Sequence, residues 1–121
     1  MQDHQRLEIW QRAMAFVVRV YQFSAQLPDD ERYNLTAQLR KAATSVPFNI
    51  AEGAACATPK EFALFLGYAY RSSKEVTTGL ELSRRLYPSL PGEEVTALID
   101  EGNQVARMTW TLIRRLGGPN S

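Results

Sequence analysis

The segment from residue 28 to residue 53, PDDERYNLTAQLRKAATSVPFNIAEG, constrains the fold more than any other part of the chain. Its apolar residues recur every three or four positions, which predicts a helix with one broad buried face. These residues are Leu35, Leu39, Ala42, Ala43, Val46, Ile50 and Gly53. Polar residues fall beside or inside the same face, so the helix is not an ordinary amphipathic one.

Those polar residues need partners, because a buried polar group without a hydrogen bond is costly. We interpret them as a polar network that fixes helix register, bonded within the chain or to a neighbouring subunit. The predicted network consists of Gln38, Arg40, Ser45, Asn49 and Glu52.

Pro47 lies in the middle of this predicted helix. Proline has no backbone N–H, and its ring clashes with the carbonyl four residues earlier, here that of Ala43. We therefore predict a kink at Pro47, with the hydroxyls of Thr44 and Ser45 available to freed carbonyls.

The rest of the chain predicts three more helices and no second domain. The expected helices cover residues 5–27, 30–54, 59–87 and 93–116, with Asp29 or Asp30 capping the second, Thr58 capping the third, and Gly117, Gly118 and Pro119 ending the fourth. Short connections place consecutive helices antiparallel. We therefore predict an all-α, antiparallel up-and-down four-helix bundle that forms a single domain over residues 1–121.

The first helix carries more apolar surface than one face of a small bundle requires. One stripe contains Leu7, Trp10, Met14, Val17 and Tyr21, and a second contains Ile9, Ala13, Phe16, Val20 and Phe23. A surplus stripe indicates either a neighbouring subunit or a larger intramolecular core. We assign an oligomer interface to Ile9, Phe16, Val20 and Phe23, together with Tyr68 and Tyr70 from the third helix.

Composition argues against enzymatic chemistry. With one histidine, His4, and one cysteine, Cys56, the chain offers no metal-ligand cluster and no histidine base for a nucleophile. Glu52 lacks the partner groups that a general base needs. We expect no catalytic residue, no metal and no cofactor. The sequence has no apolar run long enough to span a membrane, and we predict a cytoplasmic protein.

Charge leaves nucleic-acid binding open. The net charge is only +1, unlike that of a dedicated nucleic-acid binder, but arginines occur in local clusters that an oligomer would multiply. The predicted phosphate contacts, without base specificity, are Arg12, Arg19, Arg84, Arg85, Arg114 and Arg115. The alternatives are an ordinary solvated surface and a protein-protein scaffold with an unknown protein partner.

The motif residues also carry a family resemblance. They are Pro28, Glu31, Tyr33, Leu35, Gln38, Leu39, Arg40, Ala42, Ala43, Ser45 and the run from Asn49 to Gly53, with Trp10, Lys60, Glu61, Phe62, Phe65, Leu66 and Ala69 outside that segment. This pattern resembles the bacterial "four helix bundle" family, which includes proteins encoded in intervening sequences of 23S rRNA genes. The family is related to the accessory variability determinant of diversity-generating retroelements.

The resemblance implies a left-handed up-and-down bundle that assembles into a homo-oligomeric ring, usually a pentamer. It also implies binding of RNA or DNA, as attributed to some members, and no established enzymatic activity. Relatives often carry arginine soon after the motif, whereas this chain has Ala55, Cys56 and Ala57.

Overall fold

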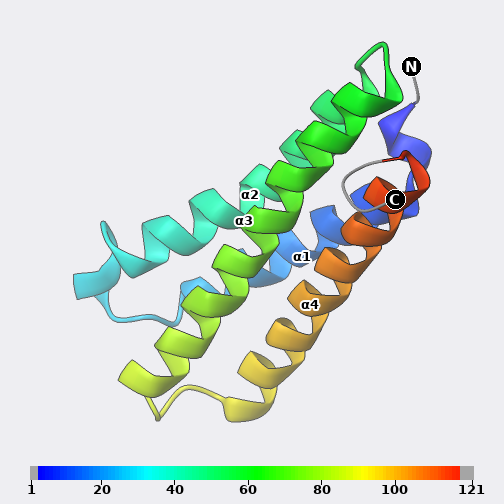
Figure 1. Cartoon of the computed structure of the whole chain (residues 1–121). Helices are drawn as coiled ribbons and strands as arrows, with labels where there is room; N and C mark the ends of the chain where they lie inside the picture. The colour runs from blue at the N-terminus through cyan, green and yellow to red at the C-terminus, as the bar shows by residue number, and fades with distance from the viewer. Residues whose placement is uncertain (1–2, 118–121) are drawn as a thin grey trace.

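The computed structural model describes residues 3–117, and over this range the chain is helical with short connections (Figure 1). The four long helices are α1 (Glu8–Ser24), α2 (Leu35–Ala54), α3 (Pro59–Leu86) and α4 (Gly92–Arg115). Two single turns of 3-10 helix, η1 (His4–Arg6) and η2 (Asp29–Glu31), precede α1 and α2. The prediction of four helices is confirmed. No helix within residues 3–117 is long and apolar enough to cross a membrane.

The connection between α1 and α2 is longer than predicted. Asn34 has a non-helical backbone, with φ −128° and ψ −99°, so the second helix begins at Leu35 instead of residue 30. Glu31, rather than Asp29 or Asp30, faces the new helix start, because its carboxylate accepts from the Leu35 N–H at 3.4 Å. The Tyr87 hydroxyl at the end of α3 also donates to Glu31 and is the main cause of its lowered carboxyl pKa.

The start of α3 follows the prediction. Thr58 is the N-cap, its hydroxyl oxygen accepts from the Glu61 N–H at 3.2 Å, and Pro59 occupies the first turn. After α4 ends, Gly117 adopts a positive φ of 76°, which glycine tolerates without a Cβ clash. Gly118 and Pro119 lie outside the described residues.

Each long helix packs on the next one along the chain, and α1 also packs on α4. Within residues 3–117 the backbones of α1 and α3 do not come close to each other, so the two helices lie diagonally across the bundle. Figure 1 shows α2 beside α3 and α3 beside α4. α2 continues as one helix through Pro47. Thr44, three residues before the proline, donates its hydroxyl to the Arg40 carbonyl at 3.0 Å.

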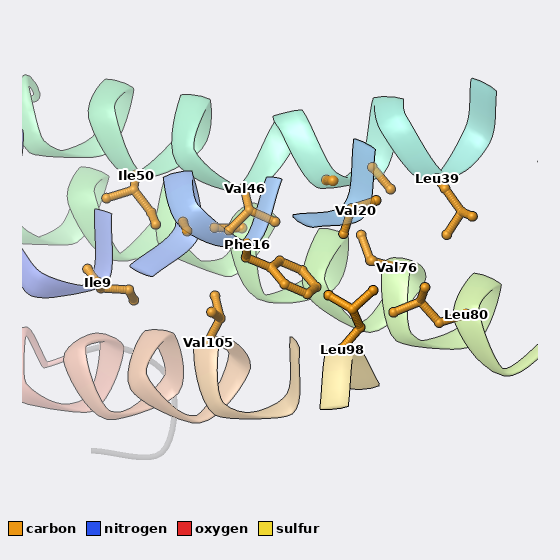
Figure 2. Close-up of a cluster of buried hydrophobic side chains, with 14 of the residues drawn as sticks. Ile9, Phe16, Val20, Leu39, Val46, Ile50, Val76, Leu80, Leu98 and Val105 are labelled. Atoms are coloured by element: carbon orange, nitrogen blue, oxygen red, sulfur yellow. The ribbon is translucent and has the colours of Figure 1, made fainter. Parts of the chain in front are cut away.

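The core corrects the interface prediction for α1. Phe16, Val20 and Phe23 are fully buried within the single chain, and Ile9 is 5% exposed. Figure 2 shows Phe16 and Val20 among side chains from the other three helices, including Val46, Val76 and Leu98. These four α1 residues therefore belong to the intramolecular core, because their stripe faces α2, α3 and α4.

A different stripe of α1 remains uncovered. Met14, Val18 and Tyr21 are 42%, 56% and 40% exposed, and their spacing of four and three residues places them on one face. Apolar periodicity placed Met14 and Tyr21 on a stripe separate from the core stripe, but it did not include Val18, and Leu7, Trp10 and Val17 of that predicted stripe pack against the core.

The helices differ in how closely they approach one another. A Cβ on Gly53 of α2 would lie 2.8 Å from Phe62 Cδ1 and 3.1 Å from the Phe62 backbone oxygen, so glycine is required for the contact with α3. A Cβ on Gly67 of α3 would meet no atom within 4 Å. Close helix packing therefore requires glycine at position 53 but not at position 67.

We predict that Gly53→Ala lowers the free energy of unfolding by about 1–3 kcal/mol, because the clash involves backbone as well as a ring. The matched variant Gly67→Ala should raise it by about 0.5–1 kcal/mol through helix propensity alone. Urea unfolding followed by circular dichroism measures both. Equal stabilities of the two variants would contradict the close approach of α2 and α3.

Candidate nucleic-acid interface

Two of the predicted phosphate-binding arginines converge on one carboxylate. Arg12 Nε lies 3.4 Å from Glu101 Oε1, and Arg19 Nη1 lies 4.0 Å from Glu101 Oε2. These pairs join α1 to α4, and Glu101 is only 21% exposed at its side chain. The two arginines are thus partly neutralised and have a structural role within the bundle.

Arg84 is held even more closely. Its Nη2 lies 2.6 Å and 2.7 Å from the two Glu81 carboxylate oxygens, and its Nη1 donates to Thr96 Oγ1 at 3.1 Å. The hydrogen bonds from Arg84 lower the pKa of the Glu81 carboxyl below its ordinary value. Arg85 Nε approaches the same carboxylate at 3.9 Å while remaining mostly exposed.

Arg114 and Arg115 lie in the last turn of α4 and are exposed. Within residues 3–117 neither forms an ion pair. Of the six predicted arginines, these two are therefore the ones that the described chain leaves unneutralised.

Charge is segregated along the α3–α4 pair. Residues 92–101, the first part of α4, hold four acids and no base, whereas residues 102–115 hold three arginines and no acid. Residues 59–74, the first part of α3, add three bases and one acid. We call residues 59–74 and 102–115 the basic half of the α3–α4 pair; its bases are Lys60, Arg71, Lys74, Arg107, Arg114 and Arg115.

A groove of about 850 Å³ lies within this basic half, between α3 and α4. Its lining includes Leu64, Gly67, Tyr68, Tyr70 and Trp110, with Lys60, Glu61 and Arg71 as its charged residues. The rings of Tyr70 and Trp110 have centroids 5.6 Å apart and planes inclined at 47°. We refer to this feature as the aromatic groove.

Sequence reasoning did not find the aromatic groove. It assigned Tyr68 and Tyr70 to an oligomer interface, which stays a prediction; the structure places both in the lining, with Tyr68 40% exposed and Tyr70 against Trp110. Helical spacing does place Leu64, Tyr68 and Arg71 on one face of α3. What the sequence does not reveal is the register that sets this face beside Trp110.

The predicted polar network divides into parts. The Ser45 hydroxyl accepts from the Asn49 amide at 2.9 Å and from the Ser72 hydroxyl at 2.8 Å, which links α2 to α3. Arg40 instead donates to Ser24 Oγ at 2.8 Å and lies 4.6 Å from the Tyr21 ring centroid. Gln38 and Glu52 are exposed, because they lie to the side of the buried face.

Within residues 3–117 no group of three or more His, Cys, Asp or Glu side chains is arranged to hold a metal ion. Three of the carboxylates with close partners, Glu31, Glu81 and Glu101, are bonded to side chains that join structural elements. Their hydrogen bonds and ion pairs have a structural explanation within the fold.

The molecule is an all-helical protein whose four long helices pack around one apolar core, with a charge-segregated pair, α3 and α4. The chain belongs to the family of 23S rRNA-intervening sequence proteins, because the model of that family matches residues 5–111. The family resemblance drawn from the motif of α2 is thereby confirmed.

A solved structure has the same fold. It is a protein of unknown function from the S23 ribosomal protein family of Bacteroides thetaiotaomicron, with a TM-score of 0.77 and 19% sequence identity. The match covers 88% of this chain and 98% of the other. A search of curated proteins finds no match to the chain.

We predict that the Ser45–Ser72 hydrogen bond couples α2 to α3 energetically. Ser45→Ala and Ser72→Ala should each lower the free energy of unfolding by about 1 kcal/mol. The double variant should lose less than the sum of the two, by at least about 0.5 kcal/mol, because both changes remove the same bond. Chemical denaturation of the four proteins completes the cycle.

Thr78→Ala provides the control, since the Thr78 hydroxyl bonds only the Lys74 carbonyl of its own helix. Its effect should simply add to that of Ser45→Ala. Strict additivity in the Ser45–Ser72 cycle as well would show that this bond contributes nothing to helix pairing.

Proposed function

We propose that this protein is a non-catalytic accessory protein that forms a homo-oligomeric ring and binds nucleic acid without sequence preference. The observation that carries the proposal is the basic half of the α3–α4 pair, where six bases and one acid share the adjoining parts of two helices. Such local charge attracts phosphates although the whole chain is nearly neutral. Binding of cellular RNA or DNA further implies a cytoplasmic location.

The proposed bundle is antiparallel, up-and-down and left-handed. Side-chain pairs support the antiparallel order, because Lys74 contacts Asn103 whereas Arg84, ten residues further along α3, contacts Thr96. The handedness rests on the family resemblance alone. This order puts the start of α3 beside the end of α4, which is what gathers their basic residues.

The proposed ring uses two exposed apolar surfaces. One is the α1 stripe of Met14, Val18 and Tyr21, and the other is Leu82 with Leu86 on α3, which are 46% and 51% exposed. Because α1 and α3 lie diagonally, the two surfaces face different directions. Contacts between two different surfaces of identical subunits form a ring when the rotation from one subunit to the next closes. The family resemblance implies a ring of five subunits.

We predict that Val18→Asp lowers the mass measured by size-exclusion chromatography with light scattering toward that of the 13.7 kDa subunit. Helicity should be unchanged because Val18 is exposed. Leu82→Asp should have the same effect from the other side of the contact. Gln104→Asp, which adds the same charge to an exposed position of α4, is the control. A full-mass oligomer in both apolar variants would overturn the assigned surfaces.

We predict that Arg114→Gln with Arg115→Gln weakens nucleic-acid binding and flattens its salt dependence between about 50 and 200 mM salt. Each lost phosphate contact should reduce the slope of log affinity against log salt by about 0.7–0.9 per subunit engaged. Fluorescence polarisation with labelled RNA and DNA measures this effect.

The matched control is Arg12→Gln with Arg19→Gln, which removes two arginines that Glu101 already engages. This pair should change affinity much less than the α4 pair does. An equal loss in both double variants would mean that net charge, not the basic half, governs binding.

The alternative function is a protein-protein scaffold without nucleic-acid affinity. The exposed apolar side chains favour it, since uncovered apolar surface is typical of protein contacts. Absence of binding at the lowest salt concentration would leave this alternative, and the search would turn to partner proteins.

A further inference from the structure

We propose that the aromatic groove is a binding site for unstacked bases of single-stranded nucleic acid. The inference rests on the proposed function and deepens it, because it names the form of nucleic acid and the place where a base enters. A duplex keeps its bases stacked inside, so only a single strand can offer a base to a groove between two helices.

The groove presents aromatic surface of the kind that stacks on bases. Trp110 is partly exposed and packs against Tyr70, and Tyr68 in the same lining is 40% exposed. Tyr68 is itself held edge-on to Phe65, with centroids 5.7 Å apart and planes at 88°. The packing of Tyr68 and Trp110 on neighbouring rings reduces the entropy that a base contact would cost.

Gly67 supplies the second observation. A glycine in a helix interior costs about 1 kcal/mol relative to alanine, so it needs a reason. Gly53, Gly79 and Gly102 have one, because a Cβ at each would lie within 3.0 Å of a neighbouring atom. Gly67 lines the groove, and a Cβ there would meet nothing within 4 Å. Its missing side chain keeps open a place where a flat ring can approach the backbone.

The charges around the groove favour phosphates. Lys60 and Arg71 line it from α3. On α4, Arg107 and Arg114 lie three residues before and four residues after Trp110, so both flank that ring on the helix surface. The one acid in the lining, Glu61, accepts a hydrogen bond from the Thr58 hydroxyl at 2.9 Å, within the cap of α3.

This combination discriminates against an apolar protein helix as the occupant. Burying the groove under such a helix would desolvate the surrounding cations without supplying anions. A single strand covers the rings with bases and brings phosphates to the same cations. The basic rim and the aromatic lining are thus both satisfied by one ligand.

The test compares a labelled oligothymidylate single strand of about twelve nucleotides with a duplex of the same length, using the unmodified chain of residues 1–121 at low salt. Gly67→Leu fills the groove without a clash at Cβ. It should weaken single-strand binding about tenfold or more and change duplex binding by less than about twofold. Gly92→Leu is the matched control, because Gly92 also has open space around it but lies outside the groove at the start of α4.

A second measurement follows Trp110 directly. In a Trp10→Phe background Trp110 is the remaining tryptophan, and the single strand should quench its emission whereas the duplex should not. Equal loss of single-strand and duplex binding in Gly67→Leu, or no quenching on binding, would overturn the base site while leaving the proposed function standing. A change of oligomer mass in Gly67→Leu would show that a second copy covers the groove, which also overturns the inference. Failure of the unmodified protein to bind either probe would reject the proposed function and the inference together.

Discussion

The register of α3 on α4 is the constraint on which the surface features of this protein depend. It is set in the bundle interior, where a Cβ on Gly102 would lie 2.6 Å from Thr77 Cγ2 and 3.0 Å from the Phe16 ring. One residue after Gly102, Asn103 accepts a hydrogen bond from Lys74 of α3. Near the start of α4, Thr96 accepts one from Arg84. Once this register is fixed, Trp110 must face Tyr70 and the basic residues of both helices must adjoin.

The arginines of α3 and α4 lie in two different electrostatic environments. Outside the basic half, Arg84 is hydrogen-bonded to Glu81 and Thr96, and its hydrogen bonds lower the pKa of the Glu81 carboxyl, which favours the charged form. In the basic half, Glu61 is the one acid among six bases, although Glu75 and Glu101 lie directly beyond its two borders. Surface ion pairs contribute little to stability, so the acids are better explained by where they place charge. Residues 75–86 and 92–101 together hold six acids and two arginines, so this part of the pair is negative and the basic half is positive.

Much of the fold was predictable because its signals are local. Thr58, Pro59 and Glu61 define the start of α3 by chemistry that acts within one turn, and the structure has that start. The role of Phe16 was not predictable in the same way, because apolar spacing identifies a buried face without saying which chain buries it. The long turn before Leu35 was missed for a related reason: Glu31 is fixed by Tyr87, which is distant in sequence.

The candidate site was harder to predict than the fold, since it arises between helices. Arg12 and Arg114 look alike in the sequence, yet Arg12 pairs with Glu101 and Arg114 does not, and that difference depends on how α1 packs on α4. The proposed oligomerisation uses exposed apolar residues that the core leaves uncovered. The proposed ring contacts, on α1 and around Leu82, lie outside the lining of the aromatic groove. A subunit with few phosphate contacts binds weakly, but linked copies raise the effective concentration of each next contact. On the proposed function, a nearly neutral chain binds nucleic acid tightly only as an assembly, so the proposal requires both the exposed apolar surfaces and the basic half.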